Sequence, residues 1–284
     1  VQDAKLFDWL VGLYEVWRHL SEEGAYVSAV IGLAELALTG YTTAADHFYL
    51  FPSSQSNEIL DRTIEAAQDV GLRFAPTRGS MSRGKSMGGL PPDDTVQTEE
   101  AILADYDRVV AAWHDDSPES MCRVALAPCS PFSVTDKLMR DTAVYARKHG
   151  LRLHTHLAET LDEEAFCLAQ HGVRPLGLME RLGWLGDDVW FAHGVHFDDA
   201  EVALLGQTGT GIAHCPVSNL RLGSGIARVP ALLDAGAPVG LAVDGSASND
   251  ASNLLRELQI ALLVHRVGTA VDAMPARRVL EMAT

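Results

Sequence analysis

Apolar side chains recur at helical spacing through the first forty residues. Between Lys5 and Leu20 they fall three or four positions apart, and Ser21 precedes a second stretch from Glu22 to Leu38. A period near 3.6 residues is typical of an amphipathic helix, and serine is a common N-cap residue. The pattern therefore predicts two helices at the start of the chain.

After Gly40, short β-rich runs alternate with segments of helical period. We predict seven strands, at Thr42 to Leu50, Leu72 to Thr77, Met121 to Pro128, Leu151 to Leu157, Val189 to His193, Gly211 to His214 and Pro238 to Val243. Helices are expected at Asn57 to Val70, Thr98 to His114, Thr135 to His149, Asp199 to Gln207 and Pro275 to Thr284. Repeated strand, helix, strand units predict a parallel sheet with right-handed crossovers.

Seven strands separated by helices are one short of a (β/α)₈ barrel. We therefore predict an α/β fold of the TIM-like barrel class, in which residues 1–284 form a single catalytic domain. Because the chain opens on helices and stops within one, we expect it to be truncated at both ends, with the first strand upstream of Val1. The long segment Gly79 to Val96 is rich in Gly, Ser, Met and Pro, which suits either an active-site cover or a surface loop.

Charge and composition narrow the class of protein. The chain has 22 Lys and Arg against 38 Asp and Glu, a formal net charge of −16, which argues against nucleic acid or an anionic membrane as the partner. No apolar run reaches the roughly 18 residues of a membrane-spanning helix. The 4 cysteines are widely spaced, which indicates neither a disulfide framework nor a thiolate zinc site. We expect a cytoplasmic globular protein.

Polar residues follow four consecutive predicted strands. His156 and Glu159 come at the end of the fifth barrel strand, His193 ends the sixth, His214 ends the seventh and Asp244 follows the eighth. Barrel enzymes assemble their active sites from these strand ends. A zinc ion held by neutral His and a carboxylate lowers the pKa of bound water to about 7, which suits hydrolysis at an sp² carbon. Glu159, three residues past His156, can face the same cavity and shuttle protons without binding the metal.

Several spaced motifs carry a family resemblance. They are His156-x-x-Glu159, Ala192-His193, the segment from His214-Cys215-Pro216 to Ile226, and the segment from Asp244 to Asp250. With these motifs the whole chain resembles the amidohydrolase superfamily, in its mononuclear-metal purine and pyrimidine deaminase branch. Within that branch, Asp46-His47 and the segment Ala127 to Ser133 are most similar to the bacterial 8-oxoguanine deaminases.

The resemblance implies roles for the strand-end residues. His156 and Asp244 would bind one zinc ion per subunit, with iron as the other possible metal, and Asp244 would also accept the proton of the attacking water. Glu159 would protonate the ring nitrogen of the substrate and then assist the leaving amine. His193 would stabilise the charge that develops on the attacked carbon's oxygen, or bind the metal in a variant site.

The resemblance also implies substrate contacts at Cys129, Ser130, His214 and Asn249. The family supplies two further metal ligands as His-x-His on the first strand, and it has a small β-sandwich domain. We find neither the first-strand His-x-His nor the sandwich, and His154-Thr155-His156 is no substitute because it lies on the fifth strand. We therefore expect the chain itself to bind zinc poorly and the whole protein to be active. His154, two residues before His156, is expected to pack outside the barrel lumen.

These features lead to one expected function and to alternatives. We expect zinc-dependent deamination of an oxidised purine, 8-oxoguanine, to urate and ammonia by a homo-oligomer whose partner is a small purine-like molecule. Related aminohydrolases act on guanine, S-adenosylhomocysteine or a chloro- or hydroxytriazine. A binuclear amidase is disfavoured because the strand at Met121 to Pro128 has no lysine. A non-catalytic barrel that acts as a binding module is disfavoured by Glu159 and Asp244, because buried carboxylates without a task are costly.

Overall fold

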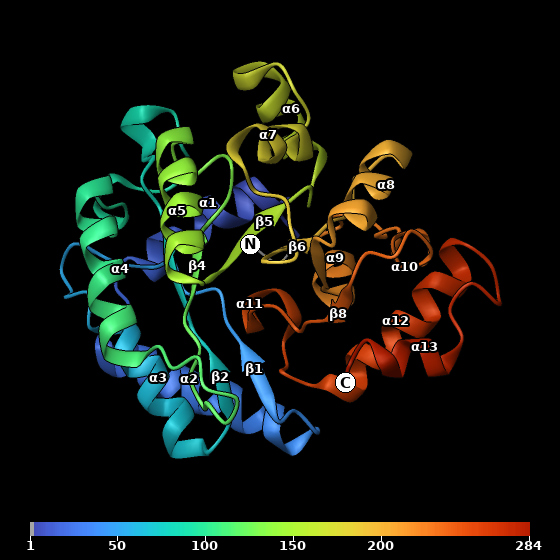
Figure 1. Ribbon diagram of the computed structural model, residues 1–284, viewed down its shortest axis with the longest axis horizontal. Coiled ribbons are helices and arrows are strands. Elements are labelled where there is room, and N and C mark those ends of the chain that lie inside the picture. The colour runs from blue at the N-terminus through green and yellow to red at the C-terminus, as the bar shows by residue number, and fades with distance from the viewer. Residues whose placement is uncertain (1–2) are drawn as a thin grey trace. The chain divides into compact units, whose positions relative to one another are not determined.

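The computed structural model describes residues 3–284, which divide into two compact units. The first ends at Thr155 and the second is His156–Thr284, so the boundary lies within strand β5 (Arg152–Leu157). In both units helices alternate with short strands that pair in parallel (Figure 1). This is the predicted α/β class, and the parallel order is consistent with a TIM-like barrel.

The first unit begins with two helices, as predicted. Its elements are α1 (Leu6–Trp17), α2 (Glu22–Leu38), β1 (Thr43–Ala45), α3 (Ile59–Val70), β2 (Arg73–Ala75), β3 (Thr77–Ser80), the 3₁₀ turns η1 (Lys85–Met87) and η2 (Asp93–Thr95), α4 (Glu99–Trp113), β4 (Ala125–Pro128) and α5 (Asp136–His149). Helices α2 and α3 lie side by side (Figure 1).

The strand predicted at Leu72 to Thr77 is two strands. β2 pairs with β1 and β3 pairs with β4, so the chain changes partner at Pro76. Proline has no backbone N–H to give to a ladder. The carbonyl of Pro76 still accepts a hydrogen bond from the backbone N–H of Ala125 at 2.9 Å. β3 then continues to Ser80, beyond the predicted end.

β1 is shorter than the predicted strand from Thr42 to Leu50. After Ala45, side chains replace ladder bonds: Thr77 N donates to Asp46 Oδ1 at 2.7 Å, and Phe48 N donates to Thr77 Oγ1 at 3.0 Å. Burial raises the pKa of Asp46 to about 7. The segment therefore stays beside β3 without forming a regular strand.

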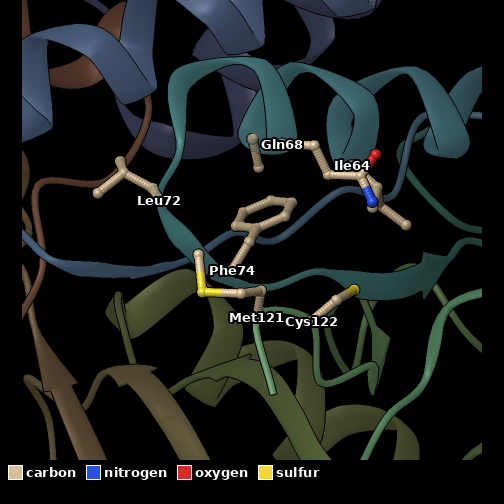
Figure 2. Close-up of a pocket in the computed structure, with 7 residues that line it drawn as sticks. Ile64, Gln68, Leu72, Phe74, Met121 and Cys122 are labelled. Atoms are coloured by element: carbon tan, nitrogen blue, oxygen red, sulfur yellow. The ribbon is translucent and has the colours of Figure 1, made fainter. Parts of the chain in front are cut away.

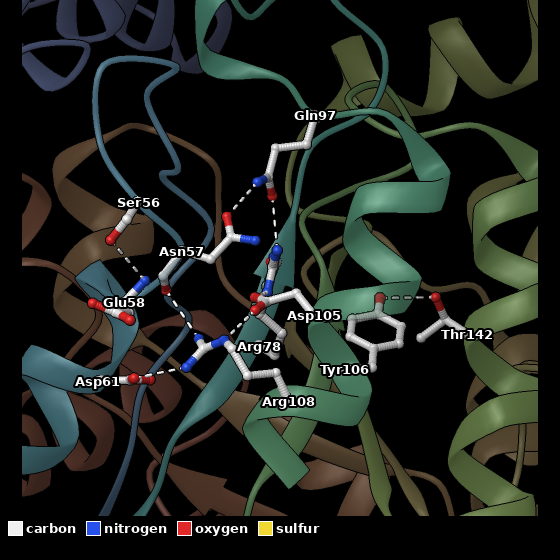
Figure 3. A network of polar contacts seen from close by, with 11 residues as sticks. Ser56, Asn57, Glu58, Asp61, Arg78, Gln97, Asp105, Tyr106, Arg108 and Thr142 are labelled. Atoms are coloured by element: carbon white, nitrogen blue, oxygen red, sulfur yellow. Dashed lines mark hydrogen bonds and ion pairs between the residues drawn. The ribbon is translucent and has the colours of Figure 1, made fainter. Parts of the chain in front are cut away.

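A buried arginine holds the first unit together around β3. Arg78 is fully buried, pairs with Asp105 of α4 and donates to Gln97 Oε1 at 2.8 Å (Figure 3). Its Cζ also lies 3.8 Å from the ring centre of Phe51. Arg108 extends this network to Asp61 at 2.7 Å. A buried guanidinium needs such partners, because it cannot lose its proton.

The second unit repeats the alternation of helix and strand. Its elements are the end of β5, α6 (Leu161–His171), α7 (Pro175–Leu182), β6 (Val189–His193), α8 (Asp199–Thr208), β7 (Gly211–His214), α9 (Pro216–Arg221), α10 (Val229–Asp234), β8 (Val239–Leu241), α11 (Ser246–Asn249), α12 (Leu254–Gly268) and α13 (Ala276–Glu281). β6 pairs with β7 and β7 pairs with β8.

The last helices of this unit share an apolar core. Met274, Val279 and Met282 pack with Val195 and Val229, and α12 and α13 lie side by side (Figure 1). Among residues 3–284 no helix is both long and apolar enough to cross a membrane. The same core also packs against Val239 and Leu241 of β8. The polar residues at the strand ends of this unit form the candidate site.

Candidate active site

Three strand ends of the second unit reverse direction at residues other than glycine. Ala158 after β5 has φ 53°, His193 at the end of β6 has φ 73°, and Asp244 after β8 has φ 60°. Residues other than glycine rarely adopt this left-handed backbone conformation, and such strain concentrates at functional sites. The bends mark the ends of β5, β6 and β8 as the place to look for chemistry.

The ends of β5 and β6 are joined by backbone hydrogen bonds and carry three of the predicted residues. Gly194 N donates to Leu157 O at 3.1 Å. The rings of His156 and His193 are stacked with centres 5.5 Å apart, and Glu159 Oε2 lies 3.5 Å from His193 Nε2. His193 and Glu159 are buried. The structure thus brings together His156, Glu159 and His193 as the sequence predicted.

Glu159 has the electrostatics of a proton donor. Burial, and then the negative charge of Asp244, raise its pKa to about 8, against the opposing effects of His156 and of a 3.4 Å hydrogen bond from Ser224 Oγ. The carboxyl is therefore mostly protonated at neutral pH. A carboxylic acid held protonated in this way can act as a general acid.

Asp244 is held in the opposite state. Its Oδ2 accepts hydrogen bonds from Ser218 Oγ and from Ser248 Oγ, the latter at 3.0 Å, and its Oδ1 accepts from Gly245 N at 2.7 Å. Burial acts to raise the pKa of Asp244, but the charge of His193, the Ser218 hydrogen bond and then the charge of His156 outweigh it and lower the pKa below its ordinary value. Asp244 is therefore ionised at neutral pH and can accept a proton or bind a cation.

A neighbouring amide sets the tautomer of His193. Its Nδ1 lies 2.9 Å from Asn219 Oδ1. Because an amide oxygen only accepts, Nδ1 carries the hydrogen and Nε2 faces Glu159. Nε2 is then the nitrogen that can gain or lose a proton or bind a metal.

His214 and Asn249 lie in the same unit, where each already has protein partners. His214 Nε2 is 3.2 Å from His265 Nε2, and burial, with the charges of His265 and His193, places the pKa of His214 well below its ordinary value. Asn249 Nδ2 donates to Glu257 Oε1 at 2.7 Å and to Val243 O. Substrate contact by His214 and Asn249 stays a prediction.

Cys129 and Ser130 belong to the first unit. Cys129 N donates to Ser80 O at 2.9 Å, and Ser130 Oγ lies 2.7 Å from Ser133 Oγ. Both residues are buried just past β4, where the sequence placed them. Their contact with a substrate stays a prediction.

His154 was expected to pack outside the barrel lumen, on the face opposite His156. That reasoning was wrong, because residues two apart in a strand share a face. His154 is buried, and its ring centre is 4.6 Å from that of His47.

Several supporting residues were missed by the sequence analysis. They are Ser218, Ser248 and Asn219, which hold Asp244 and His193, and two buried glutamates, Glu163 and Glu257. Glu257 of α12 accepts hydrogen bonds from Asn249 Nδ2 at 2.7 Å and from Val217 N at 3.4 Å. Burial is the main cause that raises its pKa to about 7. Their signal in the sequence is weak, because serine, asparagine and glutamate are common at turns and helix starts.

The donors at these strand ends suit part of a metal site. His156 and Asp244 offer an imidazole nitrogen and a carboxylate oxygen, both of which zinc accepts. The charge of His156 acts on Asp244, so the two lie in one electrostatic environment. Over residues 3–284, no group of three or more His, Cys, Asp or Glu is arranged to hold a metal ion. These residues therefore fit a metal as two members of a larger ligand set.

A pocket in the first unit has a different character. Phe74 of β2 lies at its centre, with Ile64 and Gln68 of α3 on one side and Met121 and Cys122 on the other (Figure 2). Burial, then the charges of Asp46 and Asp115, raise the pKa of Cys122 to about 11, so its thiol is neutral and weakly nucleophilic. The pocket offers apolar surface and no acid–base pair.

Known proteins match the whole chain. An 8-oxoguanine deaminase from Pseudomonas aeruginosa is 49% identical over 284 residues, 100% of this chain and 63% of that protein. An isoxanthopterin deaminase from an unknown prokaryotic organism is 41% identical, over 97% of this chain and 58% of that protein. The chain therefore spans about 60% of the length of these curated relatives.

The fold is shared with solved structures. A crystal structure of an atrazine chlorohydrolase from Arthrobacter aurescens TC1, complexed with zinc, matches with a TM-score of 0.94 and 34% identity, over 100% of this chain and 64% of that one. The sequence profile of the amidohydrolase family matches residues 2–284. The chain therefore belongs to the amidohydrolase family.

Proposed function

We propose that the whole protein is a hydrolytic deaminase of an oxidised purine, which converts 8-oxoguanine and water to urate and ammonia. The observation that carries this proposal is the meeting of a protonated Glu159, an ionised Asp244 and the imidazoles of His156 and His193 within one unit. The 49% identity to an 8-oxoguanine deaminase supports the choice of substrate.

The two carboxyls divide the proton transfers. Glu159 is protonated at neutral pH and donates to the ring nitrogen beside the carbon under attack, which makes that carbon more electrophilic. Asp244 is ionised and accepts the proton of the attacking water. The ionised Glu159 then assists the departure of the amine: the proton held by Asp244 passes to the amine, which leaves as ammonia, and the hydroxyl proton on the ring carbon returns to Glu159 as the carbonyl forms. The opposite pKa shifts of the two groups are what this division of labour needs.

His193, with a proton on Nε2 as well as on Nδ1, stabilises the charge that develops on the oxygen added to the ring carbon. Its position rests on the hydrogen bond to Asn219, which orients Nε2 toward Glu159. In a variant of the site the same nitrogen could serve as a metal ligand. Either role requires the ring orientation that Asn219 sets.

His156 and Asp244 would hold one divalent ion per subunit, zinc in the first instance and iron as the alternative. Once bound, a zinc ion would lower the pKa of a coordinated water molecule to about 7. Support comes from the nitrogen and oxygen donors and from the zinc complex of the atrazine chlorohydrolase. A homo-oligomeric assembly, a cytoplasmic location and a single barrel domain over residues 1–284 stay predictions.

A triazine hydrolase is the second candidate function. The fold match to the atrazine chlorohydrolase, at 34% identity, favours it, and both reactions add water to an electron-poor ring carbon. The Glu159 and Asp244 pair serves either substrate class. Only the measured turnover of a purine and of a triazine can therefore distinguish the two candidate functions.

The test is ammonia release by the zinc-loaded whole protein with 8-oxoguanine, guanine and S-adenosylhomocysteine, beside amine or chloride release from a triazine. We expect 8-oxoguanine to be preferred. Glu159→Gln should lower kcat by about 10²- to 10⁴-fold, the usual contribution of a general acid. Turnover of the triazine alone would favour the second candidate, and no turnover despite bound zinc would favour a non-catalytic binding module.

A further inference from the structure

The proton donor Glu159 is itself held by a second buried glutamate. Glu163 of α6 is 1% exposed. Its Oε1 accepts a hydrogen bond from Ala158 N at 2.9 Å, and its Oε2 accepts one from Glu159 N at 3.1 Å. One carboxyl group therefore accepts hydrogen bonds from two successive backbone amides at the end of β5.

These two amides lie at the bend that aims Glu159. Ala158 has φ 53°, a left-handed conformation that is strained for a residue with a side chain. Such a bend persists only where neighbouring groups stabilise it. The two oxygens of the Glu163 carboxyl group stabilise both peptide units of the bend, since buried N–H groups need acceptors.

An ordinary helix cap in the same unit shows that Glu163 does more than cap α6. In α8, Glu201 stands at the third helical position, and its carboxylate accepts from the backbone N–H of the N-cap residue Asp198 at 2.9 Å. Glu163 holds the equivalent position in α6, whose N-cap is Thr160. Its carboxylate reaches past the cap to the two residues before it. Glu163 therefore departs from the usual capping box, because its hydrogen bonds go to Ala158 and to Glu159, the proposed proton donor.

We infer that Glu163 is a positioning residue for the reaction: it fixes the left-handed bend at Ala158 and so holds the Glu159 carboxyl beside His193. The inference rests on the proposed function, because it assigns Glu163 a part in proton transfer by Glu159. Glu163 acts through Glu159 and does not touch the reacting atoms.

The first test is Glu163→Gln in the zinc-loaded whole protein, with Glu201→Gln as the matched control. Glutamine keeps the volume but replaces one acceptor oxygen with a donor, so one amide loses its partner. We expect kcat to fall about 10- to 100-fold with little change in KM, as for a small misplacement of a reacting group. Glu201→Gln should lower the melting temperature and leave kcat within about twofold, since caps act on stability.

The second test asks whether the effect passes through Glu159. In a double-variant cycle, adding Glu163→Gln to Glu159→Gln should cost no further activity, because residues that act as a unit are strongly non-additive. Glu163→Asp keeps both acceptor oxygens on a shorter arm and should lie between the wild type and Glu163→Gln. Additive losses in the cycle would overturn the positioning role.

Amide hydrogen exchange tests the contact without any substrate. The amides of Ala158 and Glu159 should exchange at least about tenfold faster in Glu163→Gln, whereas those of α8 should not change. Unchanged exchange at both amides, or a kcat within about twofold of the wild type, would overturn the inference. A wild type without deaminase activity but with the exchange effect would overturn the proposed function and still support the hydrogen bonds of Glu163.

Discussion

Two carboxyls of the second unit respond to one environment in opposite ways. Glu159 is buried with one weak hydrogen bond, 3.4 Å from Ser224 Oγ, so its burial dominates and raises its pKa to about 8. Asp244 accepts three hydrogen bonds, and these with nearby His charge outweigh its burial. The charge of His193 is the largest effect that lowers the pKa of Asp244, followed by the Ser218 hydrogen bond, whereas Glu159 faces the negative charge of Asp244. Neighbouring charge together with hydrogen bonding therefore decides which carboxyl is the acid and which is the base.

The raised pKa of Glu159 predicts the alkaline limb of activity. The protonated form is the active one, and it is lost as pH rises through about 8. We expect kcat to be level near pH 7 and to fall about tenfold per unit well above pH 8, measured as ammonia release from pH 6 to 10. The residual rate of Glu159→Gln should lack this limb. A level profile up to pH 10 would remove Glu159 from the role of acid.

The serines around Asp244 predict an effect on metal binding. Ser218 and Ser248 both donate to Oδ2, and such hydrogen bonds orient a ligating carboxylate. The double variant Ser218→Ala and Ser248→Ala should bind zinc about 10- to 100-fold more weakly, measured by competition with a chelator. Thr208→Ala, whose hydroxyl bonds to the backbone of its own helix, is the control and should keep wild-type affinity. Equal affinities would mean that Asp244 needs no such support.

Sequence could identify the residues that carry chemistry but not those that hold them. His156, Glu159, His193 and Asp244 were predictable because each falls at or just after a strand end and few residue types do their chemistry. The hydrogen bonds of Glu163 depend on a left-handed backbone bend at Ala158. Such a bend is usually predicted from a glycine, and alanine at this position gives no sign of it.

At the scale of elements, the sequence predicted the bounds of some helices and strands well, as in α2, β6 and β7, and missed others, as in α12. The bounds of α2 are those predicted from Ser21 and the apolar period, because a cap and a periodic face are both local signals. Strand ends depend on partners far along the chain. The prediction of one strand at Leu72 to Thr77 missed the change of partner at Pro76. That change is seen only in the structure, where β2 pairs with β1 and β3 pairs with β4.

The packing of α8 on α10 predicts an unusual effect of alanine. A Cβ added at Gly206 in α8 would lie 2.0 Å from the backbone oxygen of Ala235, which cannot move like a flexible side chain. Gly206→Ala should therefore lower the free energy of unfolding by about 1 to 3 kcal/mol despite the better helix propensity of alanine. The measurement is urea unfolding of the wild type and the variant.

The matched control for this helix contact is Gly177→Ala in α7. There the nearest atom to an added Cβ, Val173 Cβ, is an ordinary 3.6 Å away. Only propensity then acts, and the variant should be more stable by about 0.5 to 1 kcal/mol. If both variants gained stability, the close approach of α8 to Ala235 would be wrong.

Across the whole chain, buried carboxyls tie stability to pH. Burial is the first cause of the raised pKa of Asp46, Glu159, Glu163 and Glu257, to about 7 or 8 in each case. The same groups titrate near pH 4 in an unfolded chain. Between these limits the folded state binds more protons than the unfolded state, so stability falls as pH rises. The net charge of −16 adds self-repulsion in the same direction.

The free energy of unfolding should therefore be lower at pH 8 than at pH 6, and Glu163 allows the cause to be isolated. Burial raises its pKa to about 8 against an ordinary value of 4.5, so it is protonated in the folded state at pH 6 and half ionised at pH 8. Its share of the loss over this interval is about 2 kcal/mol. Glu163→Gln removes that titration, and the unfolding free energy of this variant should fall less between pH 6 and 8 than that of the wild type.

Salt distinguishes the two sources of pH dependence, because about 0.5 M salt screens surface repulsion but not a buried carboxyl. A wild-type slope that vanishes in salt would assign the pH dependence to net charge, and one that persists in salt and shrinks in the variant assigns it to the carboxyl that holds the bend at Ala158.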